Sequence, residues 1–258
     1  ITWFSLNRLI STVGNPINLG ASLIIWIISY LYFMYTSKLK LLKYSFPIII
    51  LITLFLVSMT LSRTSLITFV LILFISLIIG ANTFRSKLYI ITVIVILITL
   101  SFTYLIQTIN IDLIIERFGN LFDTNEYSKN ARVKNWFYAI STFENFEYLW
   151  GKGLGASTPN SEYVNLYGGL MIESSFISII INYGVIGFLF FSIVYIRFFT
   201  ITIYIYKKNK YLGMFLLLFL ITYSIYSLAN DYNRNLPYVL YFWIFYYYAE
   251  INYKKLFL

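Results

Sequence analysis

The chain has neither cysteine nor histidine among its 258 residues, and these two absences exclude several kinds of site. Without cysteine it can form no disulfide bond and no zinc–thiolate centre. Without histidine it can hold no Ser-His-Asp triad and no histidine general base. Any acid–base chemistry must therefore rest on other side chains.

Charged residues are also scarce. They make up 11% of the chain, whereas apolar residues make up 60%, and a soluble domain carries about 25% charged residues. Apolar runs of about 18 or more residues are typical of membrane proteins. The chain begins with Ile1 in a polar loop and shows no secretory signal. We therefore expect a fragment that lacks N-terminal spans, with residues 1–258 forming a single polytopic membrane domain.

Several hydrophobic segments are long enough to be predicted as transmembrane helices. They lie near residues 17–36, 46–61, 64–82, 88–107, 173–203, 211–229 and 237–250. Pro47 suits the first turn of the second helix. The segment 173–203 is long enough for a tilted helix or for one that projects beyond the bilayer. The predicted fold class is an all-α integral membrane protein, a multi-span helical bundle with about seven transmembrane helices.

The basic residues alternate along these segments in a way that predicts orientation. One set of loops and helix ends carries Lys38, Lys40, Lys43, Arg85, Lys87, Arg197, Lys207, Lys208, Lys210, Lys254 and Lys255, accompanied only by Glu250. The positive-inside rule assigns this side to the cytoplasm. Residues 1–16, the turn at 62–64, the large loop at 108–172 between spans four and five, and the turn at 230–236 then lie outside. The net charge of +9 is thus a topology signal rather than a nucleic-acid footprint.

The large outer loop contains an amphipathic helix, predicted near residues 131–146. In "ARVKNWFYAISTF" the apolar residues Val133, Trp136, Phe137, Ile140 and Phe143 recur at helical spacing. Such a helix lies on the membrane surface, or it packs on the protein as a lid. Both interpretations bring Arg132 to the level of the lipid headgroups.

A glycine-rich segment, "GKGLGA", follows at residues 151–156. A nucleotide-binding loop would need a strand before it and a helix after it, and neither is predicted. Gly151, Gly153 and Gly155 are instead expected to allow a tight turn or a close approach of the backbone to another group.

Besides Arg132, three charged residues are candidates for a site. Arg63 is the one charged residue between Lys43 and Arg85, and a charge inside a membrane costs about 2.5–3.5 kcal/mol. It either snorkels to the interface or binds an anion, since a guanidinium gives forked hydrogen bonds to phosphate. Arg117, next to Glu116, is a solvated loop charge or a second anion ligand. Glu173 stands near the start of a span, where the helix dipole favours a carboxylate even without chemistry.

Five stretches, taken in order, resemble the O-antigen polymerase and ligase superfamily. They are "RLISTVGNPINLGA", "LSRTSL", "ARVKNWFYAISTF", "WGKGLGAS" and "ESSFISIIINYGVIGFLFF". The resemblance implies a helical fold of the glycosyltransferase C type and enzymes that use undecaprenyl-diphosphate-linked glycans on the outer leaflet. It implies that Arg63 and Arg132 lie near the lipid diphosphate, with Arg117 as a looser match. Gly151, Gly153 and Gly155 would form a supporting loop.

The resemblance also bears on the reaction. Ligases of the superfamily have a characteristic histidine near the "ES" position, where this chain has Glu173 and no histidine. This departure favours a polymerase of capsule, exopolysaccharide or O-antigen repeat units, with Glu173 as the candidate catalytic base beside Arg63 and Arg132. The alternatives are an O-antigen-type ligase and a flippase or transporter of polyprenyl-linked glycans, although no internal repeat typical of transporters is visible.

The expected substrates are a polyprenyl-diphosphate-linked oligosaccharide donor and acceptor within the lipid bilayer. A flippase and a chain-length regulator are the candidate protein partners. The sequence has no P-loop and no Asp-x-Asp pair, so we expect a reaction that needs no nucleotide, metal or cofactor. The expected location is the bacterial cytoplasmic membrane, with several passes and the active site on the outer face.

Overall fold

The computed structural model describes residues 16–60, 62–80, 135–157, 172–231 and 236–255. Contacts between Cα atoms divide the chain into two compact units. The first unit comprises Ile1–Leu121 with Ile203–Thr222, and the second comprises Phe122–Thr202 with Tyr223–Leu258.

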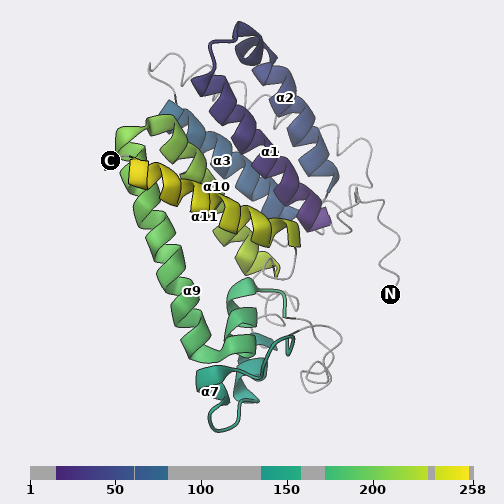
Figure 1. Ribbon diagram of the computed structural model, residues 1–258. Helices are drawn as coiled ribbons and strands as arrows, with labels where there is room; N and C mark the ends of the chain where they lie inside the picture. The colour runs from purple at the N-terminus through teal and green to yellow at the C-terminus, as the bar shows by residue number, and fades with distance from the viewer. Residues whose placement is uncertain (1–15, 61, 81–134, 158–171, 232–235, 256–258) are drawn as a thin grey trace. The chain divides into compact units, whose positions relative to one another are not determined.

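The described residues form helices joined by turns and loops, and they contain no strand (Figure 1). The helices are α1 (Pro16–Thr36), α2 (Lys40–Met59), α3 (Arg63–Gly80), α7 (Glu147–Trp150), α9 (Ser175–Lys208), α10 (Lys210–Ala229) and α11 (Leu236–Lys255). A further helical segment covers residues 135–141. Four of the helices, α1, α2, α9 and α10, are long and apolar enough to cross a membrane. The described part of the chain is thus all-helical, and these four helices are those of a multi-pass membrane protein.

Most predicted spans correspond to helices. Helices α1 and α10 match the predicted segments 17–36 and 211–229 closely. Helix α3 covers residues 64–80 of the predicted segment 64–82, and α11 covers 237–250, and the passage of both through the membrane stays a prediction. The predicted span at 88–107 lies outside the described residues. The basic clusters coincide with helix ends, with Lys207 and Lys208 in the last turn of α9 and Lys254 and Lys255 in the last turn of α11.

The predicted start of the second span is wrong. Helix α2 begins at Lys40 rather than near residue 46, so Pro47 lies inside the helix instead of in its first turn. A proline in a helix interior removes one backbone donor and strains the preceding turn. That turn is supported from α1, because the Tyr30 hydroxyl donates to the Leu42 carbonyl and also contacts the Ser45 hydroxyl. Such support from side chains and neighbouring helices is how membrane helices tolerate proline.

In the first unit, helices α1, α2 and α3 contact one another pairwise and lie side by side (Figure 1). Their buried side chains include Ile24, Ile28, Leu31, Leu54, Val57, Phe69 and Ile72. Because lipid is as apolar as these side chains, close packing rather than the hydrophobic effect holds such helices together. Some buried hydroxyls bond within their own helix, as where Thr53 donates to the Ile49 carbonyl at 2.8 Å.

The second unit contains an aromatic core and a cavity. The Phe242 ring of α11 packs against Tyr223 of α10 and Phe198 of α9, with ring centroids 4.8 and 5.6 Å apart. A cavity of about 420 Å³ lies beside this core, lined by Ile179, Tyr183, Gly187, Phe190, Phe191, Val194, Tyr223, Val239, Phe242 and Trp243. Glu250, the acid predicted on the basic side, accepts two hydrogen bonds from the Arg197 guanidinium.

Helix α9 is broken at Gly184. This residue has φ 67° and ψ −168°, which is not helical, and Figure 1 shows a sharp bend beside α7. The expectation of one helix through 173–203 is therefore wrong at this point. The physical reason lies in another part of the unit, because a loop bonds to the backbone that the break exposes.

Candidate functional site

The turn that presents Arg63 is built from its own neighbours. Ser62 caps helix α3, since its hydroxyl accepts the Ser65 backbone N–H at 3.3 Å. The Thr60 hydroxyl donates to the Val57 carbonyl at 2.7 Å and accepts the Ser62 N–H at 3.3 Å. Arg63 is the first residue of α3. A cation at a helix N-terminus lies at the positive end of the helix dipole. An anion bound at this turn would therefore be attracted by the cation and by the dipole.

The glycine-rich segment docks on the broken helix. The N–H of Lys152 bonds to the Ile181 carbonyl at 2.8 Å, and the N–H of Gly153 bonds to the Asn182 carbonyl at 3.2 Å. In an unbroken helix these carbonyls would accept bonds from residues four positions further on. The loop thus replaces the helical hydrogen bonds that α9 loses at Gly184.

The glycines at this contact are required by space and by backbone conformation. Gly151, Gly153 and Gly155 all have positive φ, at 76°, 98° and 86°, a region that favours glycine. A Cβ atom at Gly151 would lie 2.5 Å from the backbone of Asn182 and Tyr183. A Cβ atom at Gly184 would overlap the Leu149 carbonyl. The expected close approach of the backbone to another group is confirmed for Gly151, and the group is helix α9.

A buried polar network fixes the same contact through side chains. The Asn182 side-chain oxygen accepts both the backbone N–H and the hydroxyl of Ser157, each at 3.1 Å. The Ser157 and Ser178 hydroxyls lie 2.7 Å apart. Both serines are about 1% exposed, so the hydrogen bonds are needed to offset their burial.

The helix at 135–141 packs on this assembly. Ala139 and Phe143 join Ala156, Ile172 and Ile181 in one buried cluster, against which Trp136 also packs. Phe137 remains 71% exposed on the other side. A helix is present within the expected range, but Phe137, which was predicted on its apolar face, is exposed, and a turn follows at Thr142, so the helix ends before the predicted residue 146. Its buried face packs on the protein, as the lid interpretation predicts.

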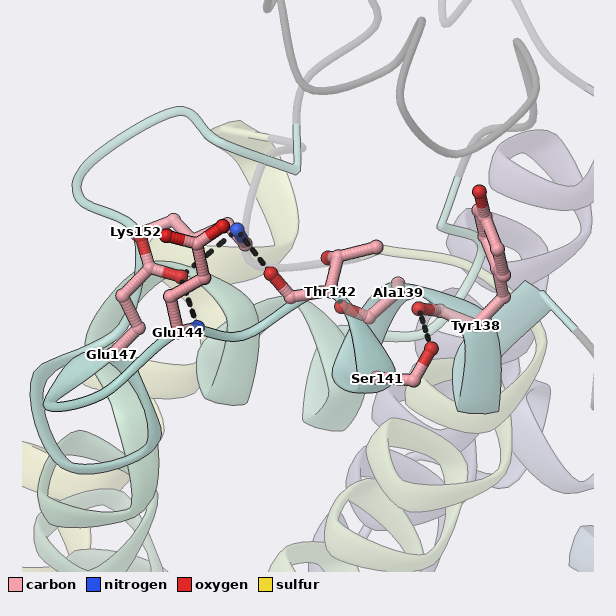
Figure 2. Close-up of polar contacts among 7 residues, drawn as sticks. All are labelled: Tyr138, Ala139, Ser141, Thr142, Glu144, Glu147 and Lys152. Carbon is pink, nitrogen blue, oxygen red and sulfur yellow. Dashed lines mark hydrogen bonds and ion pairs between the residues drawn. The ribbon is translucent and has the colours of Figure 1, made fainter.

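Lys152 links the loop to this helix through its side chain (Figure 2). Its Nζ donates to the Thr142 carbonyl at 2.9 Å and lies 2.9 Å from Oε2 of Glu147. The same Glu147 oxygen accepts the Glu144 backbone N–H at 2.9 Å. This backbone bond, followed by the bond from Lys152, holds the pKa of Glu147 below its ordinary value.

Glu173 stands at the start of α9, next to the buried cluster. The preceding residue, Ile172, is 2% exposed and belongs to that cluster. The two following residues bond to the end of α10, where the Ser174 hydroxyl donates to the Ser227 carbonyl at 3.4 Å and the Ser175 hydroxyl to the Asn230 carbonyl at 3.2 Å. Glu173 itself is half-buried. Its backbone is therefore anchored on both sides.

The structure brings together some predicted site residues. Glu173, the glycine loop and the helix that follows Arg132 in the sequence all belong to the second unit, and one packed cluster contains Ile172 beside Glu173, Ala156 of the loop and Ala139 of the helix. Arg63 belongs to the first unit. Arg117 and Arg132 lie outside the described residues. Among the described residues, no three His, Cys, Asp or Glu side chains gather as metal ligands would.

Several residues of this assembly were not predicted. Asn182 and Gly184 were taken as part of an apolar span, although a polar residue followed closely by glycine in such a run signals a possible break. Ser174, Ser178 and Asn182 recur at a spacing of four, which is typical of one polar face of a helix. Lys152 was not singled out, and the sequence contains no signal for its burial.

Comparison with known proteins identifies the family. The family model described as O-antigen ligase matches residues 48–192. The chain belongs to this family. The match covers more than half of the chain and includes the Arg63 turn, the helix at 135–141, the glycine loop and Glu173. No curated protein and no solved structure gives a significant match. The family consists of membrane enzymes of the O-antigen ligase and polymerase type, which process lipid-linked glycans.

Proposed function

We propose that the chain is a polymerase of oligosaccharide repeat units linked to a polyprenyl diphosphate, acting on the outer face of the bacterial cytoplasmic membrane. The observation that carries this proposal is the family match over residues 48–192, which contains every proposed site residue. The absence of histidine favours polymerase over ligase, because the resemblance associates a histidine with ligases. In this proposal, the chain has about seven transmembrane spans and a fold of the glycosyltransferase C type.

In the proposed reaction, an acceptor hydroxyl attacks the anomeric carbon of the donor glycan. A bond from the hydroxyl oxygen to this carbon forms, and the bond from the carbon to the diphosphate oxygen breaks. The leaving polyprenyl diphosphate gains negative charge, which Arg63, Arg132 and Arg117 stabilise as preorganised donors. Glu173 accepts the hydroxyl proton. The diphosphate supplies the driving force, so the step consumes no nucleotide.

Two features of the structure support this assignment. Glu173 is held between the buried cluster and the end of α10, as a base that must be in reach of a hydroxyl requires. The cavity beside α9 is lined mainly by apolar side chains and offers space for part of a hydrocarbon chain such as the lipid carrier has.

A flippase that delivers the units and a chain-length regulator are the proposed protein partners.

The product found in a deletion strain distinguishes the candidate functions. A polymerase deletion accumulates single repeat units on the lipid carrier at the outer leaflet. Full-length polymer retained on the carrier would instead indicate the ligase that the family description names. Units trapped on the inner leaflet would indicate a flippase, and either result would overturn the proposal.

Two substitutions test the assigned residues within the same strain. Arg63→Lys keeps the charge but loses the forked donors, so we expect reduced polymer. If that variant made as much polymer as the wild type, Arg63 would have no bidentate contact with the diphosphate. Glu173→Gln keeps the shape of the side chain but cannot accept the proton, and undiminished polymer would remove Glu173 as the base.

A further inference from the structure

Lys152 touches three separate segments of the second unit. Its backbone N–H bonds to the Ile181 carbonyl of the broken helix α9 at 2.8 Å. Its ammonium bonds to the Thr142 carbonyl, which directly follows the helix at 135–141, and pairs with Glu147 in α7, both at 2.9 Å. Lys152 thus connects its own loop to α7, to the end of the helix at 135–141 and to the broken part of α9.

The ammonium is buried to an unusual degree. The Lys152 side chain is 4% exposed, whereas that of Glu147 is 31% exposed. Burial of an ammonium is costly unless it is paired and hydrogen-bonded. Here the carboxylate, the carbonyl and the Phe143 ring, 5.7 Å from Nζ to its centroid, all face the charge. A lysine that only made the loop soluble would not need these partners.

The segments that Lys152 holds are those next to the proposed site residues. Arg132 precedes the helix at 135–141 by three positions in the sequence. Phe143, under the ammonium, packs in the same buried cluster as Ile172, and Glu173 follows Ile172. We propose that Lys152 is a positioning residue, whose ion pair with Glu147 holds the helix after Arg132 and the segment before Glu173 in register for glycan transfer. This inference rests on the proposed function.

The competing role for a lysine in this loop is direct contact with the substrate diphosphate. The two roles make opposite predictions for Glu147. If Lys152 positions the segments through the ion pair, loss of the Glu147 charge weakens the register and lowers the rate. If Lys152 binds the anion itself, loss of that charge frees the ammonium and strengthens binding.

The test compares Glu147→Gln and Lys152→Met with the unsubstituted full-length protein. The proteins are purified in lipid nanodiscs and supplied with lipid-linked repeat units extracted from the deletion strain. We expect both variants to lower kcat by about 10- to 100-fold, since small misplacement of catalytic groups has effects of this size, with KM changing less. Lys152→Arg, which keeps donors for both oxygens, should retain more activity than Lys152→Met. Glu144→Gln is the matched control, because the Glu144 side chain is exposed and its substitution removes the same charge from the same loop.

Three results would overturn the proposal. A Glu147→Gln variant with a lower KM or a higher rate would make Lys152 a substrate ligand. A Lys152→Met variant with wild-type kcat would leave it without a role in the reaction. If Glu144→Gln lowered kcat as much as Glu147→Gln, both effects would come from the loss of negative charge in the loop and not from the ion pair.

Hydrogen exchange separates this proposal from the proposed function. In Lys152→Met we expect exchange of backbone amides at 135–143 and 172–175 to rise at least 10-fold, while α10 stays unchanged. This readout needs no substrate. If the unsubstituted protein makes no polymer, the polymerase assignment fails although Lys152 still holds these segments. If exchange does not change, the positioning role fails whatever the enzyme makes.

Discussion

Helices α3 and α9 are each preceded by a serine beside a charged residue, Ser62 before Arg63 and Ser174 after Glu173, yet the two starts are held in different ways. At α3, Ser62 caps its own helix and Thr60 closes the turn before it. At α9, Ser174 and Ser175 donate to the Ser227 and Asn230 carbonyls at the end of α10. One start is fixed by neighbours in the sequence and the other by a distant helix. The comparison shows which parts of this fold a sequence can reveal.

The largest expected effect comes from the break in α9. Gly184→Ala places a Cβ atom against the Leu149 carbonyl at a residue whose φ is 67°. We expect a loss of about 2–6 kcal/mol, which combines backbone strain with overpacking. Thermal unfolding of the purified protein in detergent measures it. Gly153→Ala is the control, since its φ of 98° is also strained but its Cβ would meet nothing within 4 Å; equal losses would show that the loop does not press on α9.

The polar network gives the next effect. Asn182→Ala removes the acceptor of the buried Ser157 N–H and one of the partners of its hydroxyl, and we expect a loss of about 1–3 kcal/mol. Unfolding in detergent again provides the measurement. Asn252→Ala on α11 serves as the reference, because Asn252 bonds only locally to the Tyr248 carbonyl on an exposed face, where substitutions usually change stability by less than about 0.5 kcal/mol. A smaller loss for Asn182 than for Asn252 would contradict the network.

The two helix starts can be compared directly. Ser62→Ala should cost about 0.5–2 kcal/mol as a lost N-cap, and Ser174→Ala about 1 kcal/mol as a lost hydrogen bond. Hydrogen exchange should rise only in the first turn of α3 for Ser62→Ala. For Ser174→Ala it should rise both at the start of α9 and at the end of α10. Exchange confined to α9 would mean that its start is held locally too.

The smallest effect concerns pH. The Glu144 N–H and then Lys152 hold the pKa of Glu147 below its ordinary value. Its contribution to stability is therefore present above the unfolded pKa of about 4.3 and is lost as the pH falls through the lower pKa of the folded state. The difference in Tm between wild type and Glu147→Gln should shrink below about pH 4. A difference that stays constant from neutral to acid pH would contradict this.

The helical parts of the fold were predictable because their signals are local. Apolar runs bounded by lysines gave the spans of α1 and α10, and Ser62 before Arg63 is a visible helix start. The start of α2 predicted from Pro47 is wrong, because support from Tyr30 on another helix allows α2 to continue on both sides of the proline. The break at Gly184 was missed although a polar residue and a glycine in the apolar run signal one, because its stability depends on the distant loop at 151–153 that replaces its hydrogen bonds.

The candidate site divides in the same way. The glycine-rich loop and Glu173 were identified from residue type and order, and the structure confirms a close backbone contact for Gly151. The roles of Arg63, Arg117, Arg132 and Glu173 stay predictions. Lys152 and Asn182 were missed because their importance comes from partners that lie far away in the sequence or in buried positions.

The reaction of the purified protein with lipid-linked repeat units tests the central claim most directly. The unsubstituted protein in nanodiscs receives these units in a buffer with a metal chelator and without nucleotide, and the glycans are separated by size. Our account predicts a ladder of glycans that grow by one repeat unit while polyprenyl diphosphate is released, and a weaker ladder with Arg63→Lys. Release of the diphosphate without a ladder, or transfer of the glycan to an acceptor that carries no diphosphate, would contradict it.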